Sequence, residues 1–257
     1  PDEHIGRIAQ QVFAERGLEV PETAIERVRR TACGNPLHAI EAALGAPTQA
    51  GQLSGTWVQD DLRTANMRGG AFERTALERF AGLSGQARLV AGVLAIAARP
   101  FSEYDLAAVT ETPPGELAAA IQSLEEEHFI RRIGSNVTFT HEQYGRSVNG
   151  SIEGRERARI HERIAATLSG SASSNPAARY EVALHLEGAG RPEESLKEAL
   201  AAADHAASVG ALRERANALA LADRVSRSGD PAITIHSLQN VISRDATGSI
   251  SFSTRDQ

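Results

Sequence analysis

The stretch at 129–148 constrains the fold more than any other part of the chain. Apolar residues alternate at 129–133 and again at 137–140, and the Gly-Ser-Asn sequence at 134–136 between them favours a tight turn. This spacing predicts a β-hairpin, the one strand pair that the whole sequence indicates clearly. Any fold for this chain must place a small hairpin among helices.

A helix should follow the hairpin directly. Thr140 stands in an N-cap position and Gln143 follows three residues later, which is the spacing of a capping box. His141 and Glu142 would then lie in the first turn. Because the first turn of a helix exposes free backbone N–H groups, an imidazole there lies where a phosphate could bind.

The composition favours closely packed helices. The hydrophobic residues AVILMFWYC make up 41% of the 257 residues but aromatic residues only 4%, so the apolar content is mostly Ala, Leu, Ile and Val. The single Cys33 excludes an internal disulfide and a cysteine zinc site, which is typical of a reducing compartment. The net charge of −6 disfavours nucleic acid and anionic membranes as partners of the surface as a whole.

We expect a cytoplasmic protein with no membrane partner. No signal peptide is visible, and the longest apolar run, at 89–98, is about half the length that a membrane span needs. The chain starts with Pro and enters a helical pattern at once, so we expect a fragment of a larger chain.

Helical periodicity divides the rest of the chain into segments. Residues 1–45 predict three helices, the third capped by Asn35 with Pro36 in its first position. Residues 46–70 lose the periodicity and are interpreted as a linker or loop. Within 71–170 the order is helix, short helix, helix, hairpin and further helices, which is the order in a winged-helix domain.

The C-terminal part resembles a helical repeat. A turn-rich sequence at 170–175 indicates a domain boundary, and 176–230 predicts three helices. A shift of 34 residues aligns their apolar positions, and this is the length of a tetratricopeptide repeat. Residues 231–257 predict a flexible tail. The expected fold class is mainly α: three N-terminal helices, a winged-helix domain with one small hairpin, and an αα-hairpin array.

Motifs for catalysis are absent from the sequence. It contains no phosphate loop G-x-x-x-x-G-K-[ST], no G-x-G-x-x-G, no H-E-x-x-H and no cysteine cluster, so we expect neither an enzyme nor a metal site in this chain. His161, His185 and His205 lie in helical segments beside Ala and Leu and are expected to have structural roles. The run of Glu at 125–127 is interpreted as a solvated helix end.

Direct DNA binding is not expected. In winged helices the third helix enters the major groove and needs Lys, Arg or neutral donors. Here the helix at 115–128 carries Glu116 and the three Glu at 125–127 but no Lys or Arg. The only basic pair nearby is Arg131 and Arg132 in the hairpin.

The order of five sequence segments resembles the part of STAND-type regulatory ATPases that follows their nucleotide-binding core. The resemblance is greatest to large LuxR-type bacterial transcriptional regulators, and similar modules accompany some bacterial protein kinases. The resemblance extends from His4 to about Arg227. The segments are GNPL at 34–37, LSGQARLVAGVLAIAARPFSEYDLAAV at 83–109, FIRRIG…VTFTHEQYGRSV at 129–148, RARIHERIAATL at 157–168, and ALHLEGAGRPEESLKEALAAADHA at 183–206.

The resemblance implies two nucleotide contacts. Gly34, Asn35 and Pro36 would form the GxP motif that ends the lid, with Pro36 on the adenine side of the nucleotide. His141 would contact the phosphates in the inactive state; Thr140-His141-Glu142 stands where the family has Met-His-Asp and shares only the histidine. The alternatives from the residues alone are an ordinary helix-to-helix turn and an ordinary helix cap.

The resemblance also implies the function. The chain would be the non-catalytic regulatory and sensor segment of a nucleotide-switched ATPase that controls bacterial transcription. ATP or ADP would be bound mainly by a nucleotide-binding core outside this chain, with no tight binding to this chain alone, and a protein or small-molecule signal would bind 176–230. Two alternatives stay open: a helical-repeat interaction scaffold with no nucleotide role, and a winged-helix DNA binder.

Overall fold

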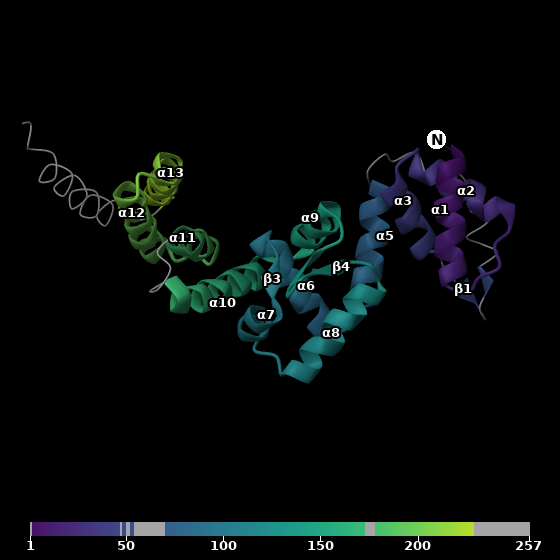
Figure 1. Cartoon of the computed structure of the whole chain (residues 1–257), viewed down its shortest axis with the longest axis horizontal. Helices are drawn as coiled ribbons and strands as arrows, with labels where there is room; N and C mark the ends of the chain where they lie inside the picture. Colours follow the sequence, from purple (N-terminus) through teal and green to yellow (C-terminus); the bar gives the residue numbers. More distant parts are fainter. Residues whose placement is uncertain (1, 47, 50–51, 54–69, 173–177, 229–257) are drawn as a thin grey trace, which may run out of the picture. The chain divides into compact units, whose positions relative to one another are not determined.

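The structure is a computed structural model that describes residues 2–46, 48–49, 52–53, 70–172 and 178–228. This part of the chain contains twelve helices and a few short strands, so the predicted mainly α fold class is confirmed (Figure 1). The chain divides into two compact units. The first comprises Pro1–Ala95 and Gly115–Ser151, and the second comprises Ile96–Pro114 and Ile152–Gln257.

The first unit begins with a bundle of three helices, as predicted. They are α1 (Asp2–Glu15), α2 (Glu22–Ala32) and α3 (Pro36–Leu44). Their apolar faces form a hydrophobic core whose buried residues all come from this bundle and the turn after it: Ile5, Ala9, Val12, Phe13, Leu18, Ile25, Val28, Ala32, Ala39, Ala43 and Ala46. The bundle therefore has a core of its own.

A second small hairpin follows the bundle. β1 (Thr48–Gln49) and β2 (Gln52–Leu53) pair antiparallel. The segment 46–70, which the sequence predicts to be a linker or loop, contains this short hairpin near its start. Two-residue strands are too short to show the alternation that identifies a strand in a sequence. The rest of the predicted loop, at 54–69, lies outside the described residues.

The helices around the predicted hairpin complete the first unit. They are α5 (Gly70–Ala81), α6 (Gly85–Ala97), α8 (Pro114–Glu126) and α9 (Glu142–Ser151), with the ends of α6 and α8 falling beyond the division. β4 (Ile130–Ile133) and β5 (Asn136–Phe139) pair antiparallel with Ile130 opposite Phe139, which confirms the hairpin. Its loop is one residue shorter than predicted, because Asn136 already pairs with Ile133.

The second unit starts with β3 (Phe101–Ser102) and α7 (Glu103–Thr110), and continues with α10 (Gly154–Ala172). Ser102 caps α7 as a capping box, because its hydroxyl accepts from the backbone N–H of Asp105 at 3.0 Å and donates to the Asp105 carboxylate at 2.8 Å. The break predicted at 170–175 begins later, since α10 continues to Ala172, which is buried. Residues 173–177 lie outside the described residues.

Three further helices complete the second unit: α11 (Arg179–Gly188), α12 (Pro192–Ser208) and α13 (Leu212–Ser228). α12 packs against both α11 and α13. Small residues dominate these interfaces, which allows the helix axes to approach closely; among the buried residues are Ala183, Ala199, Ala202, Ala203, Ala218 and Ala222. The tail predicted at 231–257 lies outside the described residues.

None of the helices within the described ranges is both long enough and apolar enough to span a membrane.

Candidate functional site

The first candidate element is the turn that starts α3. Cys33 and Gly34 both have left-handed backbone conformations, with φ of 47° and 82°, and they end α2. Asn35 is the N-cap of α3, since its side-chain oxygen accepts from the backbone N–H of Leu37 at 3.0 Å, and Pro36 occupies the first turn as predicted. Gly34 and Pro36 are exposed. The turn therefore presents a rigid helix start to solvent.

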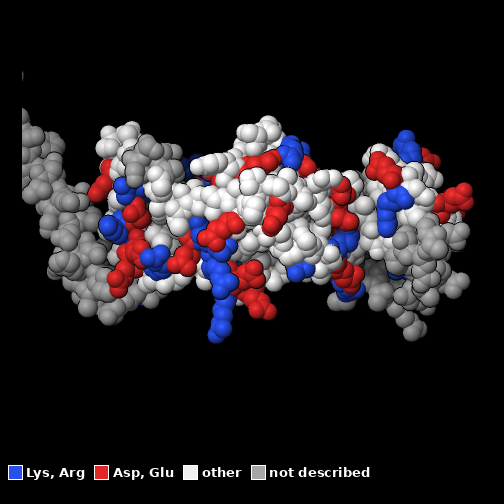
Figure 2. Space-filling view, turned by 90° about the horizontal axis from the view of Figure 1, so that it is seen from below, with Lys and Arg blue, Asp and Glu red and all other residues white. Residues whose placement is uncertain are grey.

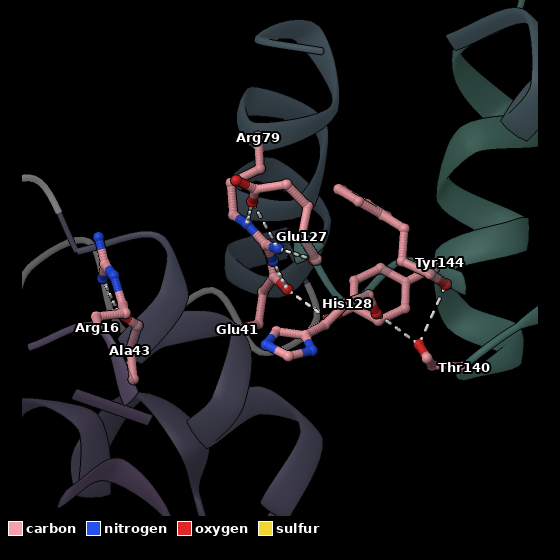
Figure 3. A network of polar contacts seen from close by, with 9 residues as sticks. Arg16, Glu41, Ala43, Arg79, Glu127, His128, Thr140 and Tyr144 are labelled. Carbon is pink, nitrogen blue, oxygen red and sulfur yellow. Dashed lines mark hydrogen bonds and ion pairs between the residues drawn. The ribbon is translucent and has the colours of Figure 1, made fainter. Parts of the chain in front are cut away.

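The second element is the start of α9, where the predicted capping box is wrong. The Thr140 hydroxyl donates to the backbone carbonyl of His128 at 2.7 Å and so closes the base of the hairpin instead of capping the helix (Figure 3). The cap is His141, whose Nδ1 accepts from the backbone N–H of Gln143 at 3.2 Å. Because the hairpin uses the threonine, the next residue takes over its role.

This cap fixes the chemistry that His141 can offer. The side chain is exposed. An Nδ1 that accepts a hydrogen bond has no proton, so the neutral ring carries its proton on Nε2. Nε2–H can therefore donate to an anionic oxygen while Nδ1 keeps the helix capped.

The two helix starts lie close together. Burial lowers the pKa of His38, and the charge of His141 lowers it further, which places the two imidazoles within electrostatic reach. One turn further along both helices, the Tyr144 hydroxyl donates to Glu41 at 2.6 Å. The electrostatic effect and the hydrogen bond are three residues apart on each helix, which indicates that α3 and α9 have their N-terminal ends on the same side. The structure thus joins α3 to α9 one helical turn beyond His38 and His141.

A buried polar network lies below these helix starts. Arg79 on α5 donates to the Glu41 carboxylate at 2.6 Å and to the Glu127 carboxylate at 3.1 Å, and it also donates to the backbone carbonyl of Glu127 (Figure 3). Its guanidinium lies 5.0 Å from the centre of the Phe129 ring. The Arg79 side chain is only 9% exposed and that of Glu41 only 1%. One arginine therefore joins α3, α5 and the turn before β4.

The buried Glu41 carboxylate is paired with a cation, but its hydrogen bonds are incomplete. Burial alone would lower the pKa of Arg79, but Glu41, Tyr144 and Glu127 together outweigh this effect and the pKa is raised. Burial, and secondly Glu41, raise the pKa of Tyr144, which stays a hydroxyl donor. The other oxygen of Glu41, Oε1, is buried and receives no hydrogen bond. A carboxylate with an unsatisfied oxygen is a costly group to bury.

A row of aromatic rings runs beside the network. His38 packs on Phe72 with ring centres 5.4 Å apart, Phe72 on Tyr144 at 5.3 Å, and Tyr144 on Phe129 at 5.0 Å. These rings come from α3, α5, α9 and the residue before β4. The contacts between the bundle and the rest of the first unit are thus aromatic as well as ionic.

Arg16 extends the network to α1. Its guanidinium donates to the backbone carbonyl of Ala43 at 2.6 Å (Figure 3). It also donates to the backbone carbonyl of Ala46 at 3.1 Å. These carbonyls lie at the C-terminal end of α3, where a cation is favourable. Burial lowers the pKa of Arg16.

Sequence reasoning did not identify His38, Glu41, Arg79 or Tyr144. Glu41 offered a signal, because it is the only charged residue in the otherwise mainly apolar helix 36–44. Glu127 belongs to the acidic run that was interpreted as a solvated helix end, and its side chain is 48% exposed although it pairs with Arg79.

No group of three or more His, Cys, Asp or Glu side chains in the described part of the chain is arranged to bind a metal ion. Comparisons with protein-family models, with curated proteins and with solved structures found no match. The resemblance to STAND-type ATPases therefore stays a hypothesis from the sequence.

Proposed function

We propose that this chain is the regulatory segment of a nucleotide-switched ATPase, in which the starts of α3 and α9 contact a nucleotide held mainly by a core outside this chain. The observation that carries the proposal is that α9 meets α3 one turn beyond His141, where the Tyr144 hydroxyl donates to Glu41 at 2.6 Å. The sequence resemblance assigns Pro36 and His141 to one nucleotide, and residues 105 positions apart in the chain can serve one ligand only if the fold brings them together.

The chemistry at this end of the two helices suits a nucleoside diphosphate. Two helix N-termini on the same side supply partial positive charge to an anion. Nε2–H of His141 can donate to a phosphate oxygen, and the exposed Pro36 ring offers an apolar surface for the base. Gly34 and Asn35 hold Pro36 in place through the turn and the cap.

The mechanism that we propose is a two-state switch without catalysis in this chain. ADP bridges the core to Pro36 and His141 and holds the closed state, and exchange for ATP together with a signal on 176–230 releases it. The output is transcriptional regulation in the cytoplasm. Acidic and basic side chains are interspersed on the face seen in Figure 2, a pattern that does not favour DNA binding there.

The test is ADP titration of the full-length protein encoded by the gene, with the variant His141→Ala. Loss of one hydrogen bond to a charged group should weaken ADP binding by about tenfold or more. His4→Ala is the control, because His4 is an exposed histidine on α1. Equal ADP affinity of His141→Ala and the unsubstituted protein would rule out the proposed contact. A phosphate loop about 200 residues upstream in the gene would identify the core.

A protein-interaction scaffold is the second candidate. Val209 and Leu212, at the turn between α12 and α13, are 62% and 75% exposed. Exposed large apolar side chains of this kind occur at protein interfaces. Capture of a partner that requires Leu212 but not nucleotide or His141 would favour this function over the first.

A further inference from the structure

The α1–α3 bundle is joined to the rest of the first unit in an unusual way. Its hydrophobic core contains only residues of the bundle and its flanking turn. Within the described residues, α1 and α2 make their extensive contacts with the bundle itself, and α3 is the bundle helix that packs extensively on α5. At this junction the buried groups are the ion pair of Glu41 with Arg79 and the aromatic rings beside it, and not an aliphatic cluster.

We propose that the Glu41–Arg79 ion pair is a latch that holds the α1–α3 bundle closed on α5 and α9, and that its opening releases the bundle as a unit. The inference concerns two conformations of this chain and does not depend on a nucleotide. If the function proposed above is right, opening the latch separates the start of α3 from His141.

The open state leaves few charges unpaired. When Glu41 withdraws with α3, Arg79 keeps the Glu127 carboxylate at 3.1 Å and the Phe129 ring at 5.0 Å. Glu41 becomes hydrated, and its Oε1, which receives no hydrogen bond in the closed state, gains water. Each half of the pair therefore has a partner after separation, as a reversible latch requires.

The closed state is favoured by only a small difference between the attraction of the ion pair and the cost of its desolvation. Burial of an ion pair costs desolvation that the attraction only partly offsets, and an unsatisfied carboxylate oxygen increases this cost. The Tyr144 hydroxyl compensates in part, since it donates to Glu41 at 2.6 Å. The bundle itself stays folded in either state because its aliphatic core is separate.

The chain offers a direct way to measure the opening. Cys33, the only cysteine, is exposed at the end of α2. Gly150 lies on α9, is exposed, and has no atom within 4 Å of an added Cβ, so Gly150→Cys supplies the second labelling site. Spin labels on these two thiols report the distance between the bundle and α9 by pulsed electron resonance.

The starting protein should give one narrow distance distribution. In Arg79→Met and in Glu41→Gln, the population of molecules with a longer and broader label-to-label distance should rise by about tenfold over that of the starting protein. The rise should be larger in Arg79→Met, because that variant leaves the Glu41 charge buried without its cation. Arg132→Met is the control, since it breaks a half-exposed pair with Glu125 in the same unit. It should keep the narrow distribution.

An unchanged narrow distribution in both variants, with helix content retained by circular dichroism, overturns the latch. If Arg79→Met loses its helix content, Glu41→Gln decides alone, because its near-isosteric amide keeps the shape of the site. Equal broadening in Arg132→Met would also overturn the proposal, since the effect would then not be specific to the buried pair.

Discussion

The two units each use a buried polar contact between helices, but the chemistry differs. In the first unit Glu41 and Arg79 are oppositely charged and compensate each other. In the second unit His161 on α10 and His185 on α11 face each other with their Nδ1 atoms 2.9 Å apart. The first contact needs both charges, whereas the second needs at least one neutral ring as acceptor.

Burial and neighbouring cations disfavour protonation of the histidine pair. Burial, then the charges of His161 and Arg99, lower the pKa of His185 to about 4. Burial and then Arg157 lower the pKa of His161, against a smaller opposing effect of Glu187. Glu181 lies 4.0 Å from Nε2 of His185 but pairs with Arg99. The expected structural role of these two histidines thus depends on their neutral form.

The largest loss of stability should come from Arg79→Met, which tests the contact in the first unit. Removing one partner of a buried ion pair leaves an unpaired charge and costs about 3–5 kcal/mol. Urea unfolding, monitored through hydrogen exchange of the helices of the first unit, measures this loss of stability. Arg132→Met, at a half-exposed ion pair, should cost less than about 1 kcal/mol. Equal losses in the two variants would contradict the assignment of Arg79 to a buried network.

Acid should weaken the second contact. The folded pKa of His185 lies below the ordinary value near 6.5, so the unfolded chain binds a proton that the folded chain does not. The contribution of neutral His185 to the free energy of unfolding is therefore fully present above about pH 6.5. It is lost as the pH falls toward 4, and for a shift of this size it is on the order of 3 kcal/mol.

Hydrogen exchange in α10 and α11 at several pH values measures this decrease. His185→Gln, which cannot titrate, should flatten it. If the variant keeps the pH dependence of the unsubstituted protein, other groups cause the decrease and the role given to His185 is wrong.

Gly188→Ala should disturb the same contact by crowding. A Cβ at Gly188 would lie 2.6 Å from atoms of the His161 ring, so the ring must move. Overpacking of this kind costs about 1–3 kcal/mol. Gly170→Ala on α10 is the matched control, because nothing lies within 4 Å of a Cβ there. Thermal unfolding should show a loss only in Gly188→Ala, and a similar change in both would indicate a general effect of glycine replacement.

Tyr144→Phe should give the smallest effect. It removes the hydroxyl that donates to Glu41 at 2.6 Å and keeps the ring contacts with Phe72 and Phe129. The loss of one buried hydrogen bond costs about 1–2 kcal/mol, with no change in helix content. Unfolding by urea measures it. A loss as large as that of Arg79→Met would mean that the hydroxyl, and not the ion pair, holds Glu41.

Local features of the fold could be predicted because their causes lie within a few residues. The Asn35 cap and the presence of the β4–β5 hairpin follow from neighbouring side chains and turn chemistry. The Thr140 cap failed for a different reason: its hydroxyl bonds to His128, 12 residues away, across a hairpin whose closure the sequence pattern does not describe.

The network could not be predicted because its partners are far apart in the chain. Arg79 lies 38 residues from Glu41, and Tyr144 lies 103 residues from it. Periodicity shows which face of a helix is buried but not which helix it meets. Pro36 and His141 were identified through the resemblance, and their neighbours His38 and Glu41 emerged only when the fold placed α3 beside α9.

The most direct test of the central claim, that the starts of α3 and α9 form one nucleotide-facing end, is hydrogen exchange of the full-length protein with and without saturating ADP. Backbone amides in the first turns of both α3 and α9 should exchange more slowly with ADP, while those of α13 should not change. The claim would be contradicted if ADP slowed exchange at only one of the two helix starts, or at neither of them.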